Sequence, residues 1–366
     1  MILQAAILLS ILFGVLIPFG TWRTCVYAAL VALVAEGALR KWFFPSAGEL
    51  LFFLKDLILI IGYAKYLRRR NRSSLPPYVY TRLKTSIAIA VTYIGVAICN
   101  FNLGSPIIGL IGFKNYLMYL PLLFMVQELF NDEKEIIRFF NFYLLILIPT
   151  FAVALLQYRS SPESRWNQYA QFDSNSAPGS GIATAGGKVR ATSFFPYISG
   201  YTGYLCANLV FLIPLLIKRN LTIYKAYYLT LLLFVLAGML MTGSRGTLVF
   251  GILFILLFCV TNPTARTDKG LATLIGSTLV IGFISLTLFP DQWNSFSARF
   301  EKAQNVELHG RIAEAGLFGV VNYIGASGFF GYGPGATYQA VGTIRGRLDL
   351  PPGTTIPFGF EDEQGR

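Results

Sequence analysis

Long apolar runs recur along this chain from its first residue almost to residue 289. A helix needs about 20 mostly apolar residues to cross the hydrocarbon core of a bilayer. Among the 366 residues 54% are hydrophobic and only 13% are charged, which is too little polar surface for a soluble protein of this length. Because backbone groups in lipid must satisfy their own hydrogen bonds, we predict an all-α, polytopic membrane protein.

These runs predict about ten membrane-spanning helices. The first run has no basic segment before it and no small-residue cleavage site, so we expect a retained span rather than a signal peptide. The four cysteines fall inside apolar runs, where a thiol usually behaves as a small hydrophobe. The expected spans cover residues 1–19, 24–39, 49–67, 85–103, 112–130, 139–157, 200–217, 226–243, 246–261 and 270–289.

The charges in the loops predict the topology. The segment from Lys65 to Lys84 is rich in lysine and arginine and has no acidic residue, so the positive-inside rule places it in the cytoplasm. By alternation, the loop at about 158–199, the turn around Arg245 and everything after residue 290 lie outside, where they can meet. The same parity places Arg40 and Lys41 outside, against the charge rule, and leaves the orientation of the N-terminus open.

Two regions follow from this topology. Residues 1–289 form the expected transmembrane domain, and residues 290–366 form part of a large periplasmic loop that we expect to be followed by one or two final spans. The net charge of +12 is carried largely by short loops between spans, where basic residues meet anionic lipid, so nucleic acid is not an expected partner.

Several common chemistries have no motif in the chain. It shows no phosphate-binding Gly-Lys-Ser/Thr loop, no zinc-type spacing of His and Cys, and no Ser-His-Asp set. These observations argue against an ATP-driven pump and a metallohydrolase, and we expect neither a metal nor another cofactor.

Arg245, in the sequence MTGSRGTLVFG, is the sharpest candidate for a functional residue. A charge at the end of an apolar span is costly and is often functional. One interpretation is an arginine that ends a helical hairpin with its head at the interface. The other is a clamp for phosphate or diphosphate, because the guanidinium is planar, permanently charged and able to bind two oxygens at once.

The sequence ELHGRIAEAGLFG contains a second pair of candidates, His309 and Arg311. On a helix, Arg311 would lie one turn from Glu307 and from Glu314, which favours ordinary salt bridges. His309 is the only histidine of the chain; it suits either a structural hydrogen bond or proton transfer.

Two further motifs lie in the outer segments. Lys188 and Arg190, in GGKVRATSFFPYISGY, are either interfacial anchors or part of an anion-binding vestibule. The alternating glycines of GFFGYGPGATY allow a tight turn or a close approach to a ligand; they are Gly331, Gly333 and Gly335.

The remaining candidates are carboxylates. Glu361, Asp362 and Glu363 form either a solvated acidic patch or a site with a general base for a sugar hydroxyl. Lys55 and Asp56 lie inside an expected span and are adjacent, so we expect them to neutralise each other. We also expect Glu36 to face a neighbouring helix.

Four segments together resemble the O-antigen ligase and polymerase superfamily, whose members join lipid-linked glycans outside the bacterial inner membrane. They are TGSRGTLV, GRIAEAGLFGVV followed by GFFGYGPGATY, LRKWFFP, and GFKNYLMYLPLLF. The resemblance implies about a dozen helical spans, a large periplasmic loop, and metal-independent transfer of a glycan from undecaprenyl diphosphate with inversion. It matches Arg245 and Arg311 to arginines that grip the diphosphate, with Arg190 as a further candidate.

Ligases of this family carry a His-Asn type motif late in the large loop, as the proposed base. This chain has FEDEQGR at the corresponding place, so Glu361 or Glu363 would take that role. The departure favours a polymerase of O-antigen or exopolysaccharide units, with an acceptor glycan as second substrate. The alternatives are a ligase that transfers glycan to lipid A-core and a transporter or flippase of lipid-linked sugars. Transporters concentrate polar residues at the bilayer midplane, whereas those here lie mostly in the outer segments.

Overall fold

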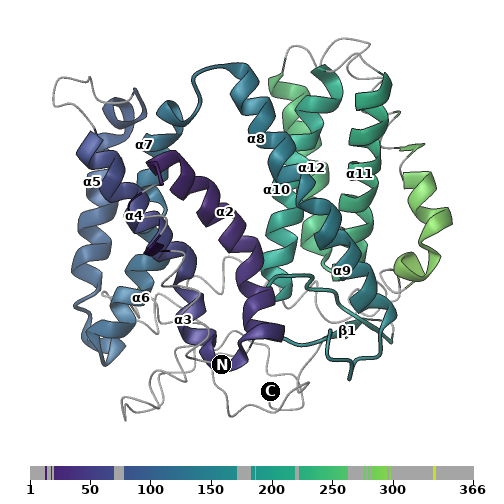
Figure 1. The fold of residues 1–366 in the computed structure, drawn as a ribbon, viewed down its shortest axis with the longest axis horizontal. Helices are drawn as coiled ribbons and strands as arrows, with labels where there is room; N and C mark the ends of the chain where they lie inside the picture. Colours follow the sequence, from purple (N-terminus) through teal and green to yellow (C-terminus); the bar gives the residue numbers. More distant parts are fainter. Residues whose placement is uncertain are drawn as a thin grey trace, which may run out of the picture. The chain divides into compact units, whose positions relative to one another are not determined.

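The computed structural model is mostly helical (Figure 1). It describes residues 13, 14, 18, 20–69, 78–170, 183–185, 187–218, 222–262, 276, 279, 280, 282–294, 297, 333 and 334. The first half contains α2 (Trp22–Ala38), η1 (Leu39–Phe43), η2 (Pro45–Ala47), α3 (Gly48–Phe52), α4 (Leu54–Arg69), α5 (Tyr78–Ala97), η3 (Phe101–Leu103), α6 (Pro106–Leu117), α7 (Leu120–Leu129), α8 (Glu133–Leu145) and α9 (Leu147–Arg159). The second half contains β1 (Thr184–Ala185), β2 (Lys188–Val189), α10 (Ile198–Lys218), α11 (Thr222–Thr242) and α12 (Arg245–Thr261).

Local sequence explains where several of these elements begin. Asp132 caps α8, because its Oδ1 accepts a hydrogen bond from the amide of Glu135 at 2.8 Å. The Glu135 carboxylate in turn accepts from the amide of Asn131, so this cap is reciprocal. Ser105 caps α6 ahead of Pro106, whose fixed φ suits the first helical position.

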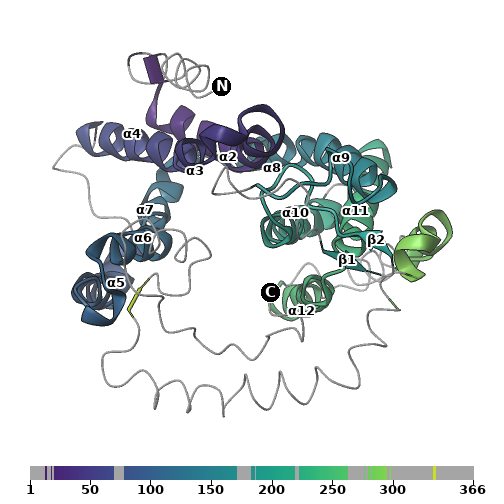
Figure 2. The same ribbon diagram turned by 90° about the horizontal axis from the view of Figure 1, so that it is seen from below.

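The chain divides into two compact units, which are described separately. The first contains Met1–Gly20, Cys25–Ile58 and Asn131–Lys302, and the second contains Thr21–Thr24, Leu59–Phe130 and Ala303–Arg366. In the first unit, α11 packs against α9 and α10, while α8 and α12 pack against α10 (Figure 2). In the second unit, α5, α6 and α7 pack together. There the Tyr66 hydroxyl donates to the Glu128 carboxylate at 2.7 Å.

Five helices of the described residues are long and apolar enough to cross a membrane. They are Trp22–Phe43, Pro106–Leu129, Glu133–Arg159, Ile198–Ile217 and Tyr224–Thr242. Two shorter apolar helices, Leu83–Ala97 and Arg245–Thr261, overlap two more expected spans. The helical, membrane-type fold is therefore confirmed, whereas the number of ten spans and the large outer loop remain predictions.

The expected span 49–67 is not a continuous helix. Phe53 interrupts it, so that α3 ends at Phe52 and α4 begins at Leu54. Most of the first expected span and part of the last lie outside the described residues, although residues 282–288 of the last are helical.

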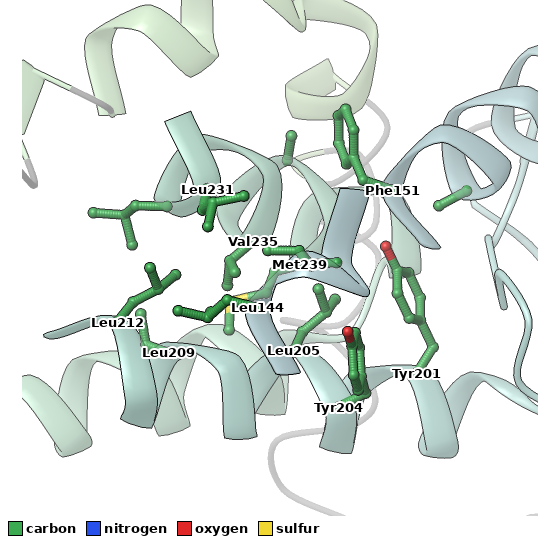
Figure 3. Close-up of a cluster of buried hydrophobic side chains, with 14 of the residues drawn as sticks. Leu144, Phe151, Tyr201, Tyr204, Leu205, Leu209, Leu212, Leu231, Val235 and Met239 are labelled. Carbon is green, nitrogen blue, oxygen red and sulfur yellow. The ribbon is translucent and has the colours of Figure 1, made fainter. Parts of the chain in front are cut away.

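The core of the first unit is formed by α8, α9, α10 and α11. Leu144, Leu205, Leu209 and Val235 are almost fully buried, and their side chains converge between these helices (Figure 3). The Phe151 and Phe234 rings stack with centroids 4.3 Å apart. Burying side chains of this size stabilises a water-soluble core by about 1.5–3 kcal/mol each; between helices in lipid, close packing is the larger part of the gain.

One side of α12 is exposed and almost entirely apolar. Leu253, Leu256, Leu257 and Val260 are each more than half exposed. Its other side packs on α10, where a Cβ on Gly251 would lie 3.3 Å from Leu209 Cδ2. An exposed apolar helix surface of this kind is suited to lipid rather than water.

Candidate functional site: a buried loop and the turn between α11 and α12

The segment from Arg190 to Pro196 joins β2 to α10 and is neither helix nor strand, yet most of it is buried. Ala191 and Ser193 have no exposed surface, and Thr192 and Phe195 are 4% and 3% exposed. We call residues 190–196 the buried loop. Irregular backbone among apolar helices must find hydrogen bonds within the protein, because lipid supplies none.

Gln157 of α9 supplies several of these hydrogen bonds. Its Oε1 accepts from the amides of Thr192 and Ser193 at 3.1 and 2.7 Å, and its Nε2 donates to the Ser193 carbonyl at 3.3 Å. Ser193 has a φ of 51°, a left-handed conformation uncommon for a residue with a side chain. Its Oγ donates to the Thr150 carbonyl of α9 at 2.6 Å, and this tertiary hydrogen bond helps to hold that conformation.

Lys41, which lies 151 residues before Thr192 in the sequence, also binds this loop. Its Nζ donates to Thr192 Oγ1 at 3.0 Å, to the Phe195 carbonyl at 2.8 Å and to the Ser193 carbonyl. The ammonium also lies 4.7 Å from the centroid of the Trp42 ring. Burying an ammonium group is costly unless it is hydrogen-bonded, so three hydrogen bonds to one loop indicate a specific role.

The helix that carries Lys41 touches the loop backbone directly. A Cβ on Gly37 of α2 would overlap the Phe194 carbonyl oxygen and lie 2.5 Å from Pro196 N and 2.6 Å from Phe195 C. Because those atoms are backbone, they cannot turn aside as a side chain end can. Only glycine allows this approach of helix and loop.

A buried ionic cluster lies beside this contact. Glu36 Oε1 pairs with Arg40 Nη1 at 3.0 Å, and its Oε2 pairs with Lys55 Nζ at 2.8 Å. Glu36 therefore does face a neighbouring helix, but Lys55 bonds Glu36, 19 residues away, and its expected partner Asp56 is not the one observed. Adjacent residues on a helix do not face each other, so Lys55 and Asp56 are poorly placed to pair.

The cluster also bears on the charges near the start of the chain. Arg40 and Lys41 are each only 3% exposed, so neither is a free loop charge that could orient a span. Arg40 further affects Tyr197, just before α10. Burial raises the pKa of the Tyr197 hydroxyl, and the Arg40 charge partly offsets that rise. This hydroxyl donates to the Ala170 carbonyl at 2.8 Å.

The first residues of the buried loop reach the turn between α11 and α12. Arg190 Nε donates to the Thr242 carbonyl at 2.7 Å, and the Ala191 amide donates to the Met241 carbonyl at 3.0 Å. Gly243 makes the turn possible with a φ of 61°, and α12 begins two residues later at Arg245. The expectation that the loop at 158–199 meets the turn around Arg245 agrees with these contacts.

The two arginines of this turn differ in their electrostatic setting. Arg190 lies at the C-terminal end of α11, where a cation is favoured by the helix dipole. Arg245 is the first residue of α12, where a cation is disfavoured, and the first turn of α12 has no acidic residue. The first amides of a helix also lack intrahelical acceptors. Both arginine side chains are partly exposed, so the turn is suited to binding an anion.

The structure describes only two of the other predicted site residues, Lys188 and Gly333. Lys188 is exposed on β2, with its Nζ 6.0 Å from the centroid of the Tyr158 ring. Gly333 has a φ of 83°, as expected of a tight turn, and a Cβ there would lie 2.7 Å from Leu103 Cγ in the second unit. Outside the described residues lie His309, Arg311, Gly331, Gly335, Glu361, Asp362 and Glu363. Within the described part, no group of three or more His, Cys, Asp or Glu side chains could hold a metal ion.

The sequence interpretation missed Lys41 and Gln157 as residues of this region. The available signal was a lysine within the apolar run that includes α2, which is unusual enough to mark a functional or structural role. Gln157 gave no such signal, because its importance depends on a loop more than 30 residues later.

Together, the fold and the site define a helical, membrane-type protein in which a cationic turn is held against a buried loop. No protein-family model, curated protein or solved structure matches the chain.

The contact at Gly37 predicts that two Gly→Ala substitutions will differ strongly in their effect on stability. Gly37→Ala forces the loop backbone away from α2, and we expect it to destabilise the protein by at least about 2 kcal/mol. The matched control is Gly203→Ala in α10, where a Cβ meets nothing within 4 Å and alanine favours the helix. The melting temperatures of both variants in detergent test this. Equal melting temperatures would contradict the close contact.

Gln157 provides a second prediction. Gln157→Leu leaves the buried amides of Thr192 and Ser193 without their acceptor, so we expect a loss of about 3 kcal/mol or more. The control Gln127→Leu replaces an exposed glutamine of α7 and should change stability little. Thermal unfolding of the purified proteins measures both effects. A Gln157→Leu protein as stable as Gln127→Leu would show that the loop does not depend on this side chain.

Proposed function

We propose that this protein is a glycan polymerase that uses lipid-diphosphate-linked oligosaccharides as donors. One observation supports the proposal most directly: Arg190 bonds the last carbonyl of α11, and Arg245 begins α12 three residues later. Two guanidinium groups close in the chain to a helix N-terminus supply cationic donors of the kind that bind a diphosphate. The apolar helices around the turn suit the lipid part of such a donor.

The proposed reaction is a transfer with inversion at the anomeric carbon. An acceptor sugar hydroxyl attacks that carbon, and the bond from carbon to the diphosphate oxygen breaks. The electron pair leaves with the diphosphate, so negative charge grows on its oxygens as the bond breaks. Cations already in place at that position stabilise the transition state without any later reorganisation.

Residues of the C-terminal segment complete the proposal. Arg311, which lies outside the described residues, is a further candidate for binding the diphosphate by its sequence motif. Glu361 or Glu363 would accept the proton of the attacking hydroxyl, with His309 as the other candidate base. We place the reaction at the outer face of a bacterial inner membrane, with undecaprenyl diphosphate as the lipid. The reaction needs neither a metal nor another cofactor.

Substitution of the two arginines tests this function in cells. We expect Arg245→Ala to lower polymer formation by about 10²-fold or more, since its charge acts on the leaving group. Arg190→Ala should also lower it. The control is Arg159→Ala, an exposed arginine at the end of α9. Glycan chain length on gels and the amount of inserted protein are measured in parallel.

The same experiment separates the alternative functions. Loss of polymer with accumulation of single lipid-linked units on the outer leaflet supports the polymerase. Units retained on the inner leaflet would instead indicate a transporter. Full-length polymer that stays on its lipid and never reaches lipid A would indicate a ligase. Normal polymer in both arginine variants would exclude the proposed site.

A further inference from the structure

We propose that Lys41 is a positioning residue: it holds the buried loop so that Arg190 is fixed at the turn between α11 and α12. Lys41 does not reach the turn itself, and its three hydrogen bonds go to residues 192, 193 and 195. The inference deepens the function proposed above, because it takes the Arg190 guanidinium to be part of the anion site.

The loop is held at two neighbouring places. At its start, the Ala191 amide and the Arg190 side chain bond consecutive carbonyls of α11, those of Met241 and Thr242. One residue later, Lys41 bonds the Thr192 hydroxyl and the carbonyls of Ser193 and Phe195. Any shift of residues 192–195 must therefore be taken up at Ala191 or Arg190, which changes where the guanidinium lies.

A lysine side chain suits this role because its ammonium group has three N–H donors for hydrogen bonds. Gln157 accepts from the loop amides and gives the Ser193 carbonyl one donor, whereas the carbonyls of Ser193 and Phe195 both accept from Lys41. One ammonium has three donors and no acceptor, so a single side chain serves both carbonyls and the Thr192 hydroxyl. Because two of its partners are backbone atoms, Lys41 recognises the path of the loop rather than its side chains.

Lys55 is a matched control for a buried lysine. Its Nζ bonds the Glu36 carboxylate and the Phe52 carbonyl, and no contact with the buried loop is seen among the described residues. Lys41→Met removes a buried ammonium of the first unit, and Lys55→Met removes a partly buried one. Only the first removes hydrogen bonds to the loop that carries Arg190.

The test uses the full chain in lipid nanodiscs and inorganic pyrophosphate as the probe. Amide hydrogen exchange of residues 190–196 reports on the loop, and calorimetric titration reports the affinity for pyrophosphate. We expect Lys41→Met to speed exchange in the loop and to weaken pyrophosphate binding about tenfold, whereas Lys55→Met does neither. In an Arg190→Ala background, Lys41→Met should weaken binding less than about twofold, since it acts through Arg190.

Two results would overturn the inference. One is unchanged loop exchange in Lys41→Met, and the other is an equal loss of affinity with and without Arg190. Failure of the proposed anion site would give a different result: the unsubstituted protein and Arg245→Ala would bind pyrophosphate with the same affinity. Loop exchange then decides alone: faster exchange confined to Lys41→Met supports the positioning role, and its absence refutes it.

Discussion

Buried backbone without regular structure is the constraint on which the first unit depends. Residues 191–195 lie among apolar helices, where each unpaired amide or carbonyl would cost about 1–3 kcal/mol. The protein meets this need with side chains from distant parts of the sequence, chiefly Lys41 from the start and Gln157 from α9. The ends of α2, α9 and α11 are thereby fixed around one loop. The cationic turn before α12 is a by-product of this arrangement, because the loop begins with Arg190.

Much of the fold could be predicted from the sequence, because hydrophobic length is a strong signal. Runs such as 200–217 and 226–243 overlap observed helices closely. The break at Phe53 could not be predicted, because the run from 49 to 67 is apolar throughout apart from four charges, and no proline marks its middle. The partner of Lys55 was missed because adjacency along the chain favoured Asp56. Adjacent residues on a helix do not face each other, and the observed partner is Glu36 of α2.

The candidate site was predictable only in part. Arg190 and Arg245 stood out because charges near apolar spans are costly, and parity alone placed their segments on the same side. The observed contact of Arg190 with this turn is made to the carbonyl of Thr242, an atom every residue has, so no sequence pattern could indicate it. The conflict between parity and the charge rule at Arg40 and Lys41 has a related origin, because both residues are buried. A charge rule counts residues by type, whereas burial decides whether a charge meets the lipid surface at all.

The contact between Gly37 and the loop has a consequence for how such a protein could diversify. On the helix, this contact requires one residue type, but in the loop it involves only the backbone of Phe194, Phe195 and Pro196. Side chains of the loop can therefore change during evolution without altering the distance between loop and helix. Related proteins could then differ in the side chains beside the turn and keep the same packing of helix and loop, provided that the glycine is retained.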